Sequence, residues 1–93
     1  MFYYTYVLRC TKNGVIYFYV GYTTDLRKRV KRHLQKEVEA TRSYERIELV
    51  YYEACQNKTD ARKRELQLKT GFGKGYIKRR LVSYLQSAGV VQQ

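Results

Sequence analysis

The chain opens on Phe2-Tyr3-Tyr4-Thr5-Tyr6-Val7-Leu8, passes through Asn13-Gly14 and reaches Ile16-Tyr17-Phe18-Tyr19-Val20-Gly21. Aromatic and β-branched residues fill the first and the last of these segments, which predicts two β-strands. Asn-Gly between two such segments is the strongest short-range signal for a two-residue hairpin turn. The sequence therefore predicts an antiparallel hairpin at the start of the fold.

The hairpin turn also sets which residues face one another. If Asn13-Gly14 is the loop, Lys12 faces Val15 and Tyr6 faces Gly21. Tyr6 and Tyr19 then become diagonal neighbours on one face, roughly 7–8 Å apart at the backbone and within reach of long side chains. Since glycine has no side chain, we expect open space beside the Tyr6 phenol.

The remaining elements follow from apolar spacing and capping residues. We expect a helix over about 25–35, capped by Thr24 or Thr23, and a connection over 37–45. A strand is expected over about 46–53, followed by a helix that begins near Asn57 or Thr59 and ends near Lys69. Gly71 and Gly73 are expected to break it before a last helix over about 74–86.

This order of elements predicts the fold class. A β-β-α-β-α-α order implies an α+β domain in which helices flank a small three-stranded antiparallel sheet. The length of 93 residues allows one domain with a modest core. We expect that domain to span 1–86 and the tail over 87–93 to be frayed.

Charge indicates the kind of partner. The sequence has 19 Lys and Arg against 8 Asp and Glu, a formal net charge of +11. Such an excess favours a polyanion, most often nucleic acid, over an anionic membrane. No apolar segment is long enough to span a bilayer, and the N-terminus does not resemble a signal peptide, so a cytoplasmic location is the default expectation.

The two cysteines do not indicate a metal or a disulfide. Cys10 and Cys55 are isolated in the sequence, and we expect both to be thiols in a reducing compartment. Two cysteines and one histidine cannot complete a four-ligand zinc shell by themselves.

Two residue pairs are candidates for chemistry. Most tyrosines in such a sheet serve packing, but Tyr6 and Tyr19 meet beside a glycine, where neighbouring positive charge or a metal would favour a phenolate base. Arg29 and His33 are four residues apart and share one helix face, next to the apolar stripe of Leu26, Val30 and Leu34. Arg29 is either a solvated charge or a phosphate ligand, and His33 is either a packed boundary histidine or a group that orients a tyrosine.

Glu65 is the one acid in a basic segment, 62–69. Ala61, Glu65 and Leu68 follow helical spacing, so we expect the carboxylate to face the sheet. It can form an i,i+4 ion pair with Lys69, or it can hold one Mg²⁺ together with a substrate phosphate and water. The sequence leaves both interpretations open.

These residues resemble those of the GIY-YIG nuclease family, in its short type related to the N-terminal domain of the excision-repair endonuclease subunit UvrC. The resemblance covers about residues 2–86. Tyr4-Thr5-Tyr6 stands where the family has Gly-Ile-Tyr, and Tyr19-Val20-Gly21 stands for Tyr-Ile-Gly. The helix motif falls on Arg29 and His33, and the glutamate of the second helix falls on Glu65.

The resemblance implies a role for each of these positions. Glu65 would coordinate a single Mg²⁺ or Mn²⁺, and Tyr6 would be the general base, assisted by His33. Arg29 would stabilise the phosphate, and Tyr19 would position water or phosphate. The products would carry 5′-phosphate and 3′-hydroxyl ends.

The sequence departs from the family pattern in two places. Tyr4 and Thr5 replace the glycine and the isoleucine of the first motif, which keeps the key tyrosine but would narrow the space at the backbone. Some relatives carry an asparagine about twelve residues after the glutamate, where this chain has Ile77, and no asparagine follows Asn57.

The leading hypothesis is a metal-dependent DNA endonuclease, structure-specific in repair or recombination, with branched or damaged DNA as candidate substrates. The alternatives are a non-catalytic nucleic-acid-binding module and a basic subunit of a larger complex. The residues expected to contact DNA are basic and lie on the first and last helices: Arg27, Lys28, Arg32, Lys74, Lys78 and Arg79. With no second domain predicted, specificity would come from substrate shape or from a protein partner.

Overall fold

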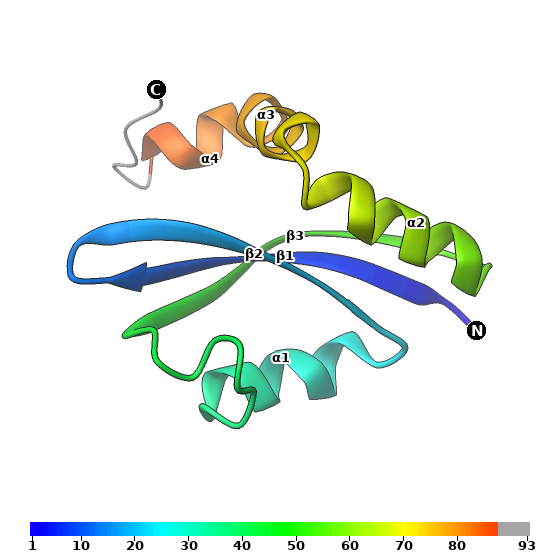
Figure 1. Ribbon diagram of the computed structural model, residues 1–93, viewed down its shortest axis with the longest axis horizontal. Coiled ribbons are helices and arrows are strands. Elements are labelled where there is room, and N and C mark those ends of the chain that lie inside the picture. The colour runs from blue at the N-terminus through cyan, green and yellow to red at the C-terminus, as the bar shows by residue number, and fades with distance from the viewer. Residues whose placement is uncertain (88–93) are drawn as a thin grey trace.

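The computed structural model describes residues 1–87, which form three layers with a sheet in the middle (Figure 1). Helix α1 covers one face of the sheet, and α2, α3 and α4 lie on the other side. The elements in chain order are β1 (Tyr3–Lys12), β2 (Val15–Thr23), α1 (Leu26–Leu34), β3 (Arg46–Cys55), α2 (Lys58–Leu68), α3 (Gly71–Arg80) and α4 (Val82–Ser87). The predicted α+β class is confirmed.

The sheet is antiparallel and has the order β2-β1-β3. The predicted hairpin register is confirmed, because Lys12 pairs with Val15 and Tyr6 pairs with Gly21. The β1–β3 register shifts between Val7 and Leu8, where β3 has an irregularity. Strand β1 begins at Tyr3, one residue after its predicted start, and both hairpin strands extend to the turn because their pairing continues up to Lys12 and Val15. Strand β3 ends at Cys55, two residues later than predicted, where it still pairs with Tyr3.

Strand alternation gives the sheet two apolar faces with separate cores. On the α1 side, Tyr6, Leu8 and Cys10 form a fully buried cluster. On the other side, Val7 packs with Leu68 of α2 and Ile77 of α3. The central strand β1 is therefore covered on both faces, and its even-numbered and odd-numbered side chains serve different layers.

Helix α1 differs from the prediction at both ends. Its N-cap is Asp25, whose side chain accepts a hydrogen bond from the Lys28 backbone N–H, while Thr23 Oγ1 accepts from the Asp25 N–H one step earlier. The predicted apolar stripe also ends early, because Leu34 is 53% exposed and His33 is fully buried in its place. The histidine can take the inward position because both of its ring nitrogens have hydrogen-bond partners there.

The C-terminal helices also differ from the prediction. Gly71 and Gly73 lie in the first turn of α3 and do not separate two helices, because Thr70 caps α3 by accepting from the Gly73 N–H. A Cβ at Gly73 would lie 2.1 Å from the Leu68 carbonyl oxygen, so the α2–α3 junction requires a glycine. The predicted last helix is divided at Leu81 into α3 and α4. The tail predicted over 87–93 lies outside the described residues except for Ser87, which ends α4.

Both cysteines are free thiols, Cys10 within the α1-side core and Cys55 at the end of β3. Burial raises the pKa of the Cys10 thiol to about 11, so it is protonated at neutral pH. Within residues 1–87, none of the helices has the length and apolar content that crossing a membrane requires.

Candidate active site

The Tyr6 phenol is the centre of the site. Strand β1 directs it toward α1, where its oxygen lies 2.8 Å from His33 Nε2 and accepts a hydrogen bond from Arg29 Nε at 3.2 Å. Arg29 and His33 reach the same oxygen because they are one helical turn apart on the inner face of α1. The structure thus brings these three predicted residues together.

Gly21 is essential to this arrangement, although not for the expected reason. A Cβ at Gly21 would lie 2.4 Å from both the Cζ and the hydroxyl oxygen of Tyr6. The predicted open space beside the phenol is therefore wrong, because the ring itself lies over the glycine. The absence of a side chain at Gly21 is what allows the phenol to lie against β2.

Tyr19 completes the aromatic part of the site. Its ring centroid is 6.4 Å from that of Tyr6 and 5.3 Å from that of His33. Tyr19 is half-buried, and it also lines a hollow of about 210 Å³ together with Lys69 and Lys74. It therefore connects the buried phenol to the side of the molecule on which α2 and α3 lie.

Thr41 is a site residue that sequence reasoning missed. It is fully buried in the connection between α1 and β3, and its Oγ1 lies 2.6 Å from His33 Nδ1. Nothing in the sequence marks one threonine in an irregular segment as the partner of a histidine eight residues earlier. The contact fixes the ring plane of His33, so that Nε2 points at Tyr6.

Burial controls protonation at this centre. Desolvation, reinforced by the positive charges of Arg29 and Arg32, lowers the pKa of His33 to about 4. Desolvation also raises the pKa of Tyr6 above its ordinary value, although the Arg29 hydrogen bond opposes the rise. At neutral pH the imidazole is neutral, so one ring nitrogen donates and the other accepts between Tyr6 and Thr41.

Glu65 reaches the site from α2. It is 7% exposed, as expected from the buried positions Ala61 and Leu68 on the same helix face. Lys69 Nζ lies 3.0 Å from Oε2 and Arg62 Nη1 lies 3.4 Å from Oε1, so the predicted pairing with Lys69 is present. Desolvation is the main cause of the raised pKa of Tyr6, and the charge of Glu65 adds to the rise as the smallest contribution.

Among the described residues, no cluster of three or more His, Cys, Asp or Glu side chains could hold a metal alone. One nearly buried carboxylate still suits Mg²⁺, which binds through one or two carboxylates, substrate phosphate and several waters. Glu65, which is now paired with Lys69 and Arg62, could supply that carboxylate. The donor set fits a metal that arrives with the substrate.

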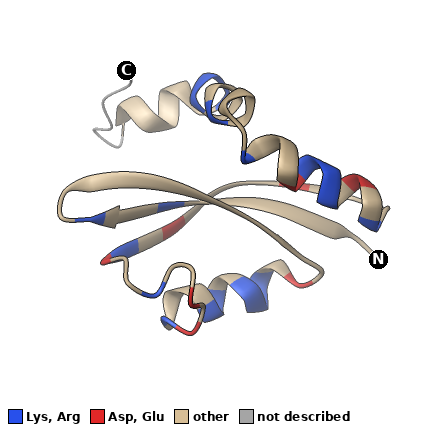
Figure 2. Ribbon diagram, viewed as in Figure 1, with Lys and Arg blue, Asp and Glu red and all other residues tan. Residues whose placement is uncertain are grey.

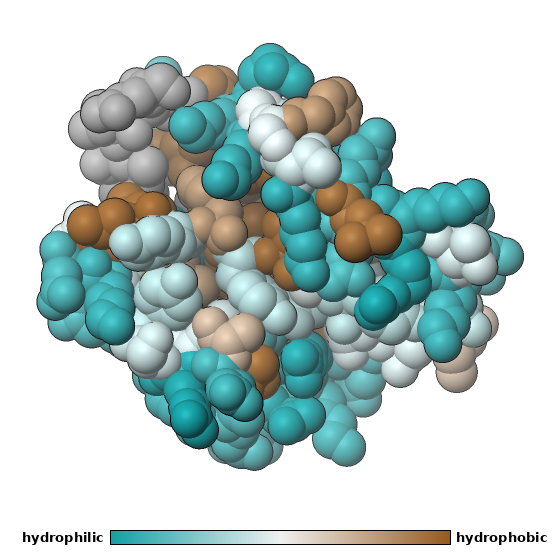
Figure 3. Space-filling model, in the orientation of Figure 1, coloured by the Kyte–Doolittle hydropathy of each residue, from teal (hydrophilic) through white to brown (hydrophobic). Residues whose placement is uncertain are grey.

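Lys and Arg residues lie on α1 and also on α2 and α3, so basic residues are present on both sides of the sheet (Figure 2). Lys28, Arg29 and Arg32 line a hollow of about 310 Å³ next to the end of β2. On the face drawn in Figure 3, the surface over α1, at the bottom of the view, is hydrophilic. Lys69 and Lys74 belong to the hollow lined by Tyr19, whose other lining residues are mostly apolar, so cations lie on both sides of the edge strand β2.

Three of the residues predicted to bind DNA do not line either of the hollows next to β2: Arg27, Lys78 and Arg79. Arg27 lines a separate hollow with Tyr4 and Tyr52, on the β3 side of α1. Lys78 is partly buried and Arg79 is exposed on the last turns of α3. Ile77, where some relatives have asparagine, belongs to the apolar core and contributes no polar group.

The fold and the site define the class of this protein. The family model described as the GIY-YIG catalytic domain matches residues 2–81, and the chain belongs to this family. Membership gives nuclease chemistry as its class of activity, with DNA as the implied substrate.

Among its relatives are UPF0213 proteins. One from Pediococcus pentosaceus is 38% identical over 68 residues, covering 72% of this chain and 68% of the relative. Another, from Pediococcus acidilactici, is 34% identical over 92 residues, covering 96% of this chain and 86% of the relative. A UPF0213 protein of Bacillus halodurans, solved by solution NMR, is 36% identical with a TM-score of 0.49, covering 90% of this chain and 85% of that chain.

Proposed function

We propose that this protein is a divalent-metal-dependent endonuclease that hydrolyses DNA phosphodiester bonds. The observation that carries the proposal is the Tyr6 phenol oxygen, held between the Arg29 guanidinium and a neutral His33 imidazole. A structural tyrosine does not need two polar partners on its hydroxyl, one of which is the only histidine in the chain. Both partners can donate to a phenolate, which is the form that accepts a proton from water.

In the proposed mechanism the ionised Tyr6 oxygen takes a proton from the attacking water. Arg29 Nε and His33 Nε2 donate to that oxygen, and the Thr41 hydroxyl donates to His33 Nδ1, which keeps the ring in the donating tautomer. The water oxygen forms the new bond to phosphorus, and the bond to the 3′ oxygen breaks. The departing 3′ oxygen takes a proton from solvent water, and the Tyr6 phenol later returns its proton to solvent, so the products are a 5′-phosphate and a 3′-hydroxyl.

The other site residues act on the phosphate. Arg29, which interacts with both Tyr6 and Tyr19, binds the scissile phosphate through its guanidinium, and Tyr19 positions the phosphate or the water. Glu65 holds the metal, which supplies charge neutralisation at the leaving oxygen when bound. Lys28, Arg32 and Lys74 bind the flanking backbone from the two hollows that line β2.

The deciding experiment is nicking of supercoiled, branched and flapped DNA with and without Mg²⁺ or Mn²⁺. We expect wild-type cleavage to require the metal and Glu65→Gln to abolish it, while metal-free DNA binding by the variant survives. Glu48→Gln is the matched control, because Glu48 pairs with Arg46 and accepts a hydrogen bond from Tyr84, outside the set of candidate site residues, and should leave cleavage intact. Equal cleavage by wild type and Glu65→Gln would reject the proposal.

A second candidate is a non-catalytic nucleic-acid-binding module. The observation that favours it is the pairing of both Glu65 oxygens with cations, an arrangement that is complete without a metal. In that case DNA binding would weaken with salt in both wild type and Glu65→Gln, and cleavage would be absent at every metal concentration.

The nuclease proposal includes three further points: a role in repair or recombination, a cytoplasmic location and a protein partner that supplies specificity.

A further inference from the structure

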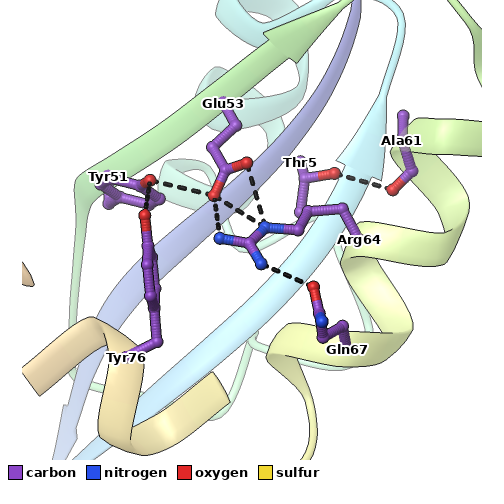
Figure 4. A network of polar contacts seen from close by, with 7 residues as sticks. All are labelled: Thr5, Tyr51, Glu53, Ala61, Arg64, Gln67 and Tyr76. Atoms are coloured by element: carbon purple, nitrogen blue, oxygen red, sulfur yellow. Dashed lines mark hydrogen bonds and ion pairs between the residues drawn. The ribbon is translucent and has the colours of Figure 1, made fainter. Parts of the chain in front are cut away.

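Arg64 of α2 is held by polar contacts on the face of the sheet opposite the Tyr6 phenol (Figure 4). Its Nε donates to both carboxylate oxygens of Glu53 on β3, each at 3.0 Å, and its Nη2 lies 2.9 Å from Oε2. Its Nη1 donates to Gln67 Oε1 at 2.6 Å. The Arg64 guanidinium therefore forms hydrogen bonds both to β3, through Glu53, and within α2, through Gln67.

Glu53 and the Arg64 guanidinium are in turn fixed by two tyrosines. Tyr51 donates to Glu53 Oε2 at 2.9 Å, and its oxygen lies 3.0 Å from the Tyr76 hydroxyl on α3. The Arg64 Cζ lies 4.6 Å from the centre of the Tyr76 ring. Because the contacts use both the edge and the face of a planar group, lysine cannot reproduce them.

A different side of α2, the buried side with Ala61 and Leu68, carries Glu65. Its two ion-pair partners also belong to that side: Arg62 lies over the Tyr22 ring of β2 at 5.0 Å, and Lys69 lines the hollow that contains Tyr19. Since the strand order is β2-β1-β3, Glu65 faces the β2 side while Arg64 is bound to β3. Arg64 and Glu65 are adjacent in sequence and about 100° apart around the helix axis.

Among the described residues, one hydrogen bond joins the centre of α2 to β1. Thr5 Oγ1, itself buried, donates to the Ala61 carbonyl at 2.9 Å. Apolar packing of Leu68 against Val7 and Val20 sets which face of α2 meets the sheet, and the directional contacts of Arg64 can then set its finer rotation. A rotation of about 10° moves a side chain at about 5–6 Å from the axis by roughly 1 Å, and a misplacement of roughly 1 Å can lower a rate by about a hundredfold.

We propose that Arg64 and Glu53 are positioning residues that set the rotation of α2 and so aim Glu65 toward the Tyr6 phenol. This inference rests on the proposed function, because it concerns the metal-binding role of Glu65. The pair is partly solvated, with 24% of the Arg64 and 32% of the Glu53 side chain exposed. An ion pair of that exposure contributes little to stability, so its main effect is geometric.

The test compares Arg64→Lys with Arg46→Lys, a matched control at the Arg46–Glu48 pair on the same strand. Each variant is measured for thermal unfolding, for metal-free DNA affinity and for the kcat and KM of metal-dependent nicking. We expect Arg64→Lys to lower kcat by roughly ten- to a hundredfold, with KM and DNA affinity within about twofold of wild type. Arg46→Lys should match wild type in all of these.

A second measurement reports the position of the bound metal relative to β2 and does not depend on catalysis. Mn²⁺ added to the isotope-labelled protein broadens NMR amide signals near its site, and Glu65→Gln defines which broadening depends on that carboxylate. In Arg64→Lys we expect broadening of the β2 amides around Tyr19 to fall relative to that of α2. Glu53→Gln, which keeps the side-chain shape, should show the same change and serves if Arg64→Lys does not fold.

The outcomes separate the two proposals. Wild-type kcat and broadening in Arg64→Lys, with Glu65→Gln inactive, would overturn the positioning role and leave the nuclease proposal standing. A kcat that falls only with the folded fraction, in both Arg64→Lys and Glu53→Gln, would reduce the pair to a structural contact and overturn the inference. Cleavage unaffected by Glu65→Gln would overturn the nuclease proposal and this inference with it.

Discussion

At the scale of single residues, the site consists of ordinary groups made unusual by burial. His33 is fully buried on α1 with both ring nitrogens in hydrogen bonds, and its pKa is lowered to about 4. Tyr6 is equally buried, and burial raises its pKa. The same desolvation thus keeps the imidazole neutral, as a donor to the phenolate requires, and makes the phenolate a stronger base once it forms.

The lowered pKa of His33 predicts how stability depends on pH. An unfolded histidine binds a proton below about 6.5, whereas the folded site resists protonation until about 4. The neutral His33 therefore contributes about 3 kcal/mol to the free energy of unfolding. This contribution is fully present above a pH of about 6.5 and is lost as the pH falls toward about 4. Urea unfolding of wild type and His33→Gln between about pH 4 and about pH 7.5 measures it, and the two curves should converge at acid pH. Parallel curves would contradict the assignment.

At the scale of elements, two glycines permit close approaches that no other residue allows. Gly21 of β2 lies against the Tyr6 ring, and Gly73 of α3 lies against the end of α2. The approach of Gly73 to Leu68, the Thr70 cap and the Arg64–Glu53 contact together hold α2 between β3 and α3. The helix that carries Glu65 is thus held at its middle and at its C-terminal end.

The two glycines at the start of α3 give a matched pair of substitutions. Gly73→Ala places a Cβ 2.1 Å from the Leu68 carbonyl oxygen, and we expect it to destabilise by about 1–3 kcal/mol or more. A Cβ at Gly71 meets nothing within 4 Å, so Gly71→Ala should stabilise by about 0.4–1 kcal/mol through the unfolded chain. Thermal and urea unfolding of both variants measure the difference. Similar destabilisation in both would show that the junction is not the constraint.

At the scale of the whole molecule, part of the net charge of +11 surrounds the site. Two hollows border β2: a basic one lined by Lys28 and Arg32, and a largely apolar one that also contains Lys69 and Lys74. Tyr19, next to the Tyr6 ring, lines the second hollow. Under the proposed function, these cations would bind a phosphate backbone that crosses the edge strand.

The charge distribution predicts the salt dependence of DNA binding. Replacing Lys28 and Arg32 by Gln should make the slope of log K against log salt shallower by roughly 2, about 0.9 for each DNA phosphate that is no longer neutralised. Lys12→Gln, at the exposed hairpin end, removes the same kind of charge and should leave the slope unchanged. Fluorescence anisotropy over a range of salt concentrations measures both. Equal changes would show that net charge alone, and not this hollow, binds DNA.

Much of the fold could be predicted because its signals are local. The hairpin register depends on a two-residue turn and on strand alternation, and it placed Tyr6 opposite Gly21 correctly. Helical spacing also predicted that Arg29 and His33 share one face of α1 and that Glu65 is buried, and the structure confirms both. The α1 cap and the α3 boundary were wrong, since neighbouring candidates such as Thr24 and Asp25 differ little in local preference.

The sequence by itself determined the α+β order, the hairpin register and the family motif, because turn chemistry and the strand and helix periods act over a few residues. Only the tertiary structure decided that Thr41 holds His33, that the Tyr6 ring lies over Gly21 and that Arg64 binds Glu53. Those contacts join side chains whose spacing along the chain carries no periodic signal. Their geometry follows from how the three layers pack, and that packing depends on the whole core at once.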